Sequence, residues 1–259
     1  MRILIVGAGG VGDAVAKILS RRTFWEAAVV TDFDPARAER TIAWIRAKHG
    51  DDVADKFVAD SIDASSADSV AEVARRHGVT HVMNAVEPKF VPTVFAGALA
   101  ASADYLDMAM TLSEPHPTAP YEQTHVKLGD AQFAADGQWK DAGRLALVGM
   151  GVEPGLSNVF ARYAVDHLFS AVHELGDGAN LVVVDDDGNE IFAPSFSIWT
   201  TIEECLNPPV IWEKDRGWFT TPPFSEPEIF DFPEGIGPVE CVNVEHEEVL
   251  MMPRWLDAQ

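Results

Sequence analysis

Residues 1–34, MRILIVGAGGVGDAVAKILSRRTFWEAAVVTDFD, decide the fold of this chain. Residues 2–6 form a short apolar run rich in Ile and Val, which is typical of a buried parallel strand. The next six residues, GAGGVG, match G-x-G-x-x-G where a strand must give way to a helix. In this motif the first glycine permits a tight turn, the second lets the backbone approach a pyrophosphate, and the third lets the helix pack on its strand. The motif therefore predicts a dinucleotide-binding loop, with cofactor-binding positions at Gly7, Gly9, Gly10, Val11 and Gly12.

A helix and a second strand follow the glycine motif. Apolar residues recur at helical spacing and predict an amphipathic helix: Val11, Ala14, Val15, Ile18 and Leu19. Residues 27–31 predict a second strand that ends at Asp32, 20 residues after Gly12, where a dinucleotide ribose needs an acceptor for its 2′-hydroxyl. Because a carboxylate repels a 2′-phosphate, we expect NAD as the cofactor. NADP stays possible, since Arg37 or Arg40 could contact a phosphate.

The charge of the chain restricts its partners. The formal net charge is −22, from 41 acidic and 19 basic residues. A surface this negative repels nucleic acid and anionic membranes, so neither is expected as a partner. It favours a small cationic substrate, such as an amino acid or a polyamine with free ammonium groups. The alternative explanation of the charge is solubility or adaptation to salt.

Other features of the sequence predict a cytoplasmic location. Met1 leads directly into the first strand without a signal peptide, and no apolar run approaches the roughly 18 residues that a membrane helix needs. Cys205 and Cys241 have no C-x-x-C spacing, so neither a disulfide framework nor a structural zinc site is expected.

The periodicity of residues 1–150 predicts an α/β domain of the Rossmann type. Further strands are expected at residues 57–59, 79–84, 105–108 and 145–148. Helices are expected to begin after Asp34 and at Ser66, and to cover residues 93–101 and 121–143. Six strands that alternate with helices describe a doubly wound parallel sheet, which serves as the NAD(P)-binding domain.

Residues 151–259 predict a second domain of mixed α+β structure, for substrate binding and dimerisation. The junction 149–155 is rich in glycine and proline, and residues 156–169 predict a helix. Segments 181–184 and 190–192 flank an Asp-rich turn and predict a hairpin. Residues 249–251 resemble a strand, and no helix returns from there to the first domain, so we expect this domain to be incomplete at its C-terminus.

Ligands of a doubly wound sheet lie beyond the carboxyl ends of its strands. That rule selects three further cofactor-binding candidates, which follow the third and fourth strands: Asp60, Asn84 and Ala85. We expect Asn84 either to lie near the nicotinamide ribose or to be a plain turn residue.

The same rule selects candidates for catalysis. Lys89 could bind a substrate carboxylate or carry a proton, or it is an exposed loop lysine. Asp107 ends an apolar strand, where a carboxylate needs a partner, either a substrate ammonium group or a backbone N–H of a neighbouring turn. Glu153 precedes a helix at the domain junction and could supply a carboxylate to the cleft, or it lies in a hinge.

Two histidines are candidates for the acid or base of an imine chemistry, and each has a structural alternative. His116 lies in a Pro-His-Pro loop and His246 in the acidic segment VEHEE. We interpret this segment as a strand, in which alternation separates Glu245 and Glu247 from His246 and Glu248. No metal site is therefore expected.

Four segments together resemble the saccharopine dehydrogenase-like family, whose members include saccharopine reductases, lysine 6-dehydrogenases and carboxynorspermidine dehydrogenases. They are GAGGVG (7–12), VMNAVEPKF (82–90), YLDMAM (105–110) and GMGVEPGLSNVFARY (149–163). The stretch FAPSFSIWTTIEECLNPP (192–209) is similar to the family's second domain, where a helix and a mixed sheet form the substrate wall and a dimer contact.

The resemblance implies an NAD(P)-dependent oxidoreductase that transfers a hydride at an amine or imine carbon of a small amino acid or polyamine derivative. Asp107 and Glu153 are then expected to orient ammonium groups, while Lys89, His116 or His246 moves the proton. A homodimer is also expected. The alternative is a non-catalytic NAD-binding regulator or partner subunit, because chains of this family continue further and return to the nucleotide domain.

Overall fold

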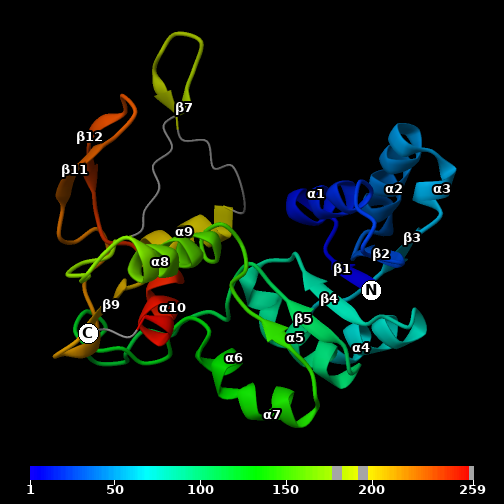
Figure 1. The fold of residues 1–259 in the computed structure, drawn as a ribbon, viewed down its shortest axis with the longest axis horizontal. Helices are drawn as coiled ribbons and strands as arrows, with labels where there is room; N and C mark the ends of the chain where they lie inside the picture. Colours follow the sequence, from blue (N-terminus) through cyan, green and yellow to red (C-terminus); the bar gives the residue numbers. More distant parts are fainter. Residues whose placement is uncertain (177–182, 192–197, 257–259) are drawn as a thin grey trace. The chain divides into compact units, whose positions relative to one another are not determined.

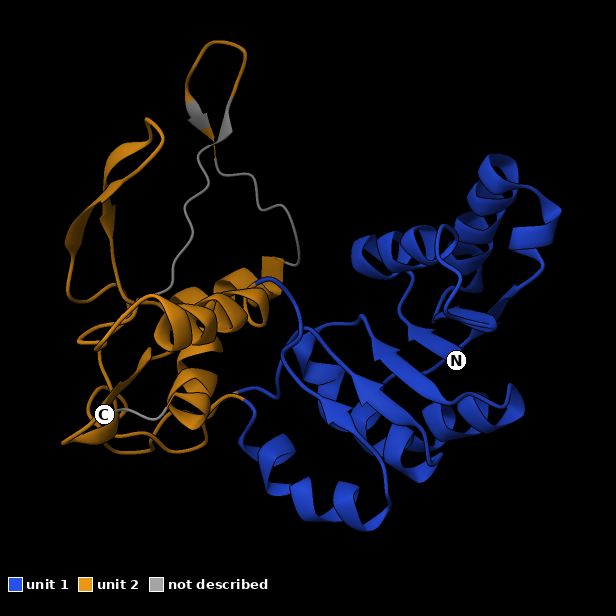
Figure 2. Ribbon diagram, viewed as in Figure 1, with its two compact units in different colours: residues 1–112, 129–152 blue, residues 113–128, 153–259 orange. Residues whose placement is uncertain are grey.

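The computed structural model describes residues 1–176, 183–191 and 198–256, and these form two compact units (Figures 1 and 2). The first unit comprises residues 1–112 and 129–152, and the second comprises residues 113–128 and 153–259. The sequence predicted one boundary at residue 150. The units instead divide after residue 152, and the segment 113–128 belongs to the second unit.

A parallel six-stranded sheet forms the centre of the first unit, with strand order β3-β2-β1-β4-β5-β6. Its strands are β1 (Arg2–Val6), β2 (Ala27–Asp32), β3 (Phe57–Ser61), β4 (His81–Asn84), β5 (Asp104–Leu106) and β6 (Ala146–Leu147). The order reverses at β1, whose neighbours are β2 and β4. Since ligands of such sheets lie where the order reverses, the carboxyl ends of β1 and β4 are the place for a cofactor.

The predicted fold class is confirmed by this sheet and its helices. The helices of the first unit are α1 (Gly10–Leu19), α2 (Pro35–His49), α3 (Asp51–Ala54), α4 (Ala67–Arg76), η1 (Pro88–Phe90), α5 (Val91–Ala100), α6 (Asp130–Ala134) and α7 (Asp136–Asp141). The predicted helix starts are also confirmed, each by a side-chain cap: Asp34 accepts a hydrogen bond from the Ala36 N–H at the start of α2, and Ser66 accepts one from the Ser69 N–H at the start of α4.

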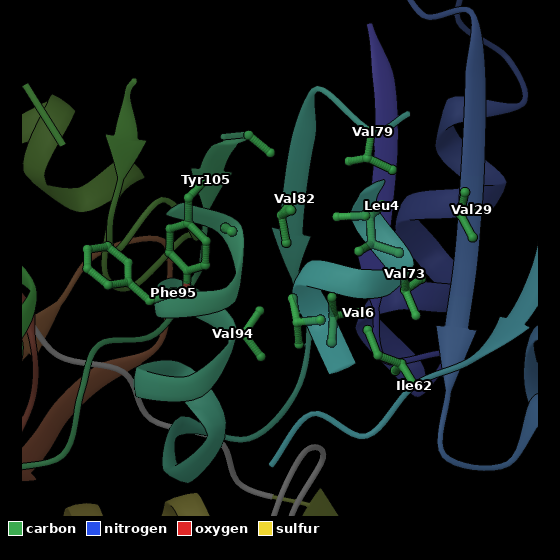
Figure 3. Close-up of a cluster of buried hydrophobic side chains, with 14 of the residues drawn as sticks. Leu4, Val6, Val29, Ile62, Val73, Val79, Val82, Val94, Phe95 and Tyr105 are labelled. Carbon is green, nitrogen blue, oxygen red and sulfur yellow. The ribbon is translucent and has the colours of Figure 1, made fainter. Parts of the chain in front are cut away.

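Both faces of the sheet are buried, as alternation along β1 requires. Leu4 and Val6 belong to the cluster shown in Figure 3, which α4 and α5 cover with Val73 and Val94 among others. The opposite face carries Ile3 and Ile5 and is covered by α1 and α2. Because both faces of the sheet are buried, the sequence of β1 is a continuous apolar run.

Three antiparallel pairs and three helices make up the described part of the second unit. The strand pairs are β7 (Val183–Val184) with β8 (Glu190–Ile191), β9 (Val210–Glu213) with β10 (Gly217–Thr220), and β11 (Glu228–Phe232) with β12 (Gly237–Cys241). The helices are α8 (Leu156–His167), α9 (Ile198–Leu206) and α10 (Glu248–Trp255). The predicted hairpin forms over β7 and β8, while residues 181, 182 and 192 lie outside the described residues.

Three sequence predictions about secondary structure are wrong. Residues 121–143 do not form one helix, because helical structure begins only after Gly129, which has φ +75°. The segment 249–251 lies in the helix α10 and is not a strand. Finally, α1 buries Gly12, Ala16 and Leu19, so Leu19 of the predicted apolar stripe is buried as expected while Val11 and Ile18 stay exposed.

In the described parts of the chain, no helix has both the length and the apolar character that are needed to cross a membrane.

Candidate functional site

The glycine loop joins β1 to α1 in a conformation that only glycine tolerates at two positions. Gly7 has φ +99°, and a Cβ there would lie 2.8 Å from the carbonyl oxygen of Ala85. At Gly12 a Cβ would lie 1.8 Å from the carbonyl oxygen of Gly7. Gly7 therefore makes the turn next to β4, and Gly12 lets the first turn of α1 pack on the loop.

The middle glycines fulfil a different requirement. A Cβ at Gly9 or Gly10 would meet nothing within 4 Å, and both residues are exposed. Gly10 is the first residue of α1, so the free N–H groups of a helix N-terminus face the same space. Because no part of the first unit requires glycine at position 9, close approach of a ligand explains its presence. The loop thus fits the pyrophosphate of a dinucleotide.

Asp32 is 5% exposed at the end of β2 and lies against this loop. Its Oδ2 accepts a hydrogen bond from the Ala8 N–H at 2.9 Å, and its Oδ1 accepts one from the Asp34 N–H at 3.1 Å. Arg37 Nη1 lies 3.8 Å from Oδ2, and its guanidinium stacks over the Phe33 ring with a centroid distance of 5.3 Å. Asp32 therefore stabilises the loop, and its remaining lone pairs can accept hydrogen bonds from a ribose.

Asn84 and Ala85 occupy the end of β4, beside the loop. The backbone N–H of Ala85 donates to the carbonyl of Val6, which keeps this residue next to the turn at Gly7. The Asn84 side chain is 3% exposed and donates to the Tyr105 hydroxyl at 2.9 Å, while its Oδ1 accepts from the Val86 N–H. Its side chain thus acts as a turn cap, which was the alternative interpretation, and Ala85 stays a candidate for backbone contact with a cofactor.

A buried polar network extends from Asn84 to the end of β6. The Tyr105 hydroxyl donates to Asp107 Oδ2 at 2.9 Å, and Gln132 Nε2 donates to the same oxygen at 2.7 Å. Asp107 Oδ1 accepts the Gly149 N–H at 2.7 Å. Burial raises the pKa of Asp107 to about 6 although all three hydrogen bonds oppose this rise. Burial and the Asp107 charge also raise the pKa of Tyr105 well above its usual value.

The predicted contact of Asp107 with a substrate ammonium group is not supported by this geometry. The residue is 1% exposed, and both carboxylate oxygens already have partners. The alternative interpretation, a backbone N–H of a neighbouring turn, describes what Gly149 does. Asp107 therefore holds the ends of β5 and β6 together.

Asp60 and Lys89 are also engaged elsewhere. Asp60 accepts from His77 Nε2 at 2.7 Å and from Arg76 at 2.9 Å. Burial raises the pKa of Asp60, but the hydrogen bond from His77 and further partners outweigh it and lower the pKa overall. Lys89 pairs with Glu87 and is 55% exposed on its loop. Asp60 is therefore paired with Arg76 and His77, and its cofactor role stays a prediction, while Lys89 is an exposed loop lysine.

The second unit concentrates carboxylates around His246. The group that we call the His246 cluster consists of Glu204 from α9 and Glu245, His246, Glu247 and Glu248 from the segment leading into α10. His246 Nδ1 is hydrogen-bonded to Glu248 and lies 3.5 Å from Glu247 Oε2, while its Nε2 lies 3.9 Å from Glu204 Oε1.

Within the His246 cluster the pKa values of Glu204, Glu245 and His246 are all raised. Burial raises the pKa of Glu204 to about 7, and repulsion from Glu247, Glu248 and Glu245 adds to this rise. Burial alone would lower the pKa of His246, but Glu248, Glu247 and Glu204 raise it to about 9. His246 is therefore protonated at neutral pH and holds a proton that it could donate.

The strand interpretation of residues 245–248 is wrong, and with it the argument that separated them. Residues 242–247 have no regular structure, and α10 begins at Glu248. As a result, one ligand atom each from Glu153, His246 and Glu248 lie within 4.8 Å of one another, as do those from Glu204, His246 and Glu247. Glu153 and His246, which were separate candidates in the sequence, thus lie close together in the structure.

His116 lies in a turn of the second unit. Its Nδ1 accepts a hydrogen bond from the Ala119 N–H at 3.1 Å, and its ring is 6.2 Å from that of His125. This is the contact of a structural turn residue. A role in proton transfer stays a prediction for His116.

Sequence reasoning missed three residues of these networks. Tyr105 and Gln132 complete the shell of Asp107, and Glu204 joins the His246 cluster. The alternation of a strand could have indicated that Tyr105 and Asp107 share a face. Nothing in the sequence pairs Gln132 with Asp107 or Glu204 with His246.

Comparisons with known proteins agree with the geometry of the first unit. Residues 3–147 match the family described as "Saccharopine dehydrogenase NADP binding domain". A solved structure, apo saccharopine dehydrogenase (L-Glu forming) from Saccharomyces cerevisiae, is similar with a TM-score of 0.61 at 16% identity, over 93% of this chain and 49% of that chain. At this identity the likeness shows the fold alone.

Two curated relatives are similar over nearly the whole chain. One is carboxyaminopropylagmatine dehydrogenase from Synechocystis, 30% identical over 254 residues, which are 96% of this chain and 57% of the relative. The other is carboxynorspermidine synthase from Vibrio cholerae, 26% identical over 261 residues, which are 100% of this chain and 61% of the relative. The chain thus spans about three fifths of the length of these relatives.

Proposed function

The chain belongs to the saccharopine dehydrogenase family, and from this premise we propose that it acts in an NAD(P)-dependent oxidoreductase. The reaction is hydride transfer at an amine or imine carbon of a small cationic amino acid or polyamine derivative. The names of the two relatives support a polyamine derivative, since one is a carboxyaminopropylagmatine dehydrogenase and the other a carboxynorspermidine synthase.

The observation that carries the proposal is the glycine loop. Glycine at position 9 has no structural cause in the first unit, whereas the approach of a pyrophosphate requires it. The bound nicotinamide cofactor supplies or accepts the hydride. The loop N–H groups hold its phosphates, and Asp32 accepts from the adenosine ribose. The Asp32 charge opposes a 2′-phosphate and favours NAD, while Arg37 beside it leaves NADP possible.

The second unit supplies the acidic and proton-carrying groups in this proposal. His246 is charged at neutral pH and is, in this proposal, the proton donor to the amine nitrogen, with Glu153 among its neighbours. The homodimer and the cytoplasmic location predicted from the sequence stay predictions. Sedimentation of the purified chain tests the first of them.

Turnover of reduced or oxidised nicotinamide tests the proposal. The purified chain is mixed with NAD⁺ or NADP⁺ and with lysine, saccharopine or a carboxynorspermidine-type amine, and absorbance of the reduced cofactor is followed. We expect an increase with at least one amine. Cofactor binding without turnover of any amine would favour the non-catalytic regulator or partner subunit instead.

A further inference from the structure

Carboxylates outnumber the one positive charge of the imidazole in the His246 cluster. Glu204, Glu247 and Glu248 lie next to the His246 ring, and Glu245 lies close enough to raise the pKa of Glu204. The raised pKa of Glu204 has the same origin, because burial and its acidic neighbours disfavour a further negative charge. A second cation would relieve this repulsion.

Glu248 provides an independent indication of a missing partner. The residue is 3% exposed, and one of its carboxylate oxygens is bonded to His246 Nδ1. The other oxygen, Oε1, is buried and has no hydrogen-bond partner among the residues that the structure describes. A buried carboxylate oxygen without a donor is costly, and native proteins generally supply one.

Two members of the His246 cluster are partly exposed to solvent. The side chain of His246 is 32% exposed and that of Glu204 is 23% exposed, whereas those of Glu247 and Glu248 are buried. A small cation from solution can therefore reach the cluster at His246 and Glu204.

The chemistry of the His246 cluster favours an organic ammonium group over a metal ion. A metal ligand must be a neutral imidazole, but the pKa of His246 is raised to about 9, so a metal has to displace a proton at neutral pH. An ammonium group needs no such displacement. It has three N–H donors, which suit carboxylate oxygens that accept hydrogen bonds.

We propose that the His246 cluster is a binding site for the terminal ammonium group of an alkylamine. Carboxylates of Glu204 and Glu248 accept its N–H groups, and His246 remains charged beside them. The terminal ammonium group is then the end of the substrate that the second unit recognises, and in that respect the inference rests on the proposed function. The chain's net charge of −22 favours the approach of such a ligand from solution.

Calorimetric titration of the whole chain with 1,3-diaminopropane, in the absence of any nicotinamide cofactor, tests the inference. Propane-1,3-diol is the neutral ligand of matched length. We expect saturable binding of the diamine and none of the diol. Glu204→Gln and Glu248→Gln should each weaken binding about tenfold, as the loss of one charge-assisted hydrogen bond does. Glu228→Gln, at an exposed position on β11, is the control and should leave binding unchanged.

A second measurement on the unmodified chain guards against a variant that fails to fold. The ring nitrogen resonances of His246, assigned with a His246→Gln variant, should shift with the diamine and not with the diol. Diamine binding that is absent, or that survives unchanged in Glu204→Gln and Glu248→Gln, overturns the inference. So does a stoichiometric Mn²⁺ or Zn²⁺ site at His246 that the diamine does not displace. Turnover without diamine binding would overturn this inference alone, since the assays are separate.

Discussion

Replacing Asp107 with asparagine tests the buried network at the ends of β5 and β6. The pKa of this carboxyl is raised from 3.8 to about 6, chiefly by burial. Because one pKa unit corresponds to about 1.4 kcal/mol, the ionised form is disfavoured in the folded chain by about 3 kcal/mol. Asparagine is nearly isosteric with aspartate and carries no charge, so it removes the pH dependence of this position.

The sign of the effect follows from the direction of the pKa change. A carboxyl whose folded pKa is raised stabilises the folded state most below its unfolded pKa, and this contribution is lost as pH rises through its folded pKa. The free energy of unfolding of the unmodified chain should therefore fall, relative to Asp107→Asn, by about 3 kcal/mol between about pH 4 and pH 7. Asparagine has only one acceptor oxygen, so it cannot accept from the Gly149 N–H as well as from Tyr105 and Gln132, which adds a constant cost of about 1–3 kcal/mol to the variant.

Urea unfolding followed by tryptophan fluorescence at several pH values measures this difference. Other groups that titrate in the same range, such as Glu204, cancel in the comparison because both proteins contain them. Asp136→Asn, which removes an exposed carboxylate on α7, is the matched control and should leave the pH dependence unchanged. A stability difference between the unmodified chain and Asp107→Asn that is constant from about pH 4 to pH 7 would refute the reasoning.

Further predictions concern the loop and the network. Gly12→Ala places a methyl group against the Gly7 carbonyl and should cost about 3 kcal/mol or more in a denaturant melt, whereas Gly10→Ala, in open space, should be near neutral; equal melts would contradict the predicted clash. Tyr105→Phe removes a hydroxyl that bridges Asn84 and Asp107 and should cost about 1–3 kcal/mol in the same melt. Asp32→Asn removes the charge that opposes a 2′-phosphate, so the ratio of NADPH to NADH affinity should rise about tenfold in fluorescence titrations; an unchanged ratio would assign cofactor choice to other residues.

Local signals were sufficient to predict the sheet of the first unit and most of its helices. The βαβ pattern, the helix starts at Asp34 and Ser66 and the alternation of strands and helices depend on neighbouring residues, and each of them forms. The buried face of α1 was harder to predict. Gly12 packs closely on the loop and shares the buried face of α1 with Ala16 and Leu19, so the apolar positions 11 and 18 turn outward.

The candidate site in the second unit could not be predicted in the same way. The alternating letters VNVEHEEV are typical of a strand, yet the chain is irregular to Glu247 and helical from Glu248. Glu204 joins these residues from α9, some 40 positions earlier in the chain. Asp107 likewise depends on Gln132 and Gly149, whose approach is set by tertiary packing and leaves no local pattern.

Binding of reduced nicotinamide cofactors to the unmodified chain and to Gly9→Ala tests the central claim most directly. The added methyl group meets no atom of the protein within 4 Å, so thermal stability should be unchanged, while the approach of a pyrophosphate is blocked. We predict that NADH or NADPH binds the unmodified chain saturably and that Gly9→Ala binds it at least about tenfold more weakly. Failure of both cofactors to bind at millimolar concentration, or equal binding by Gly9→Ala, would contradict the assignment of this loop as a dinucleotide site.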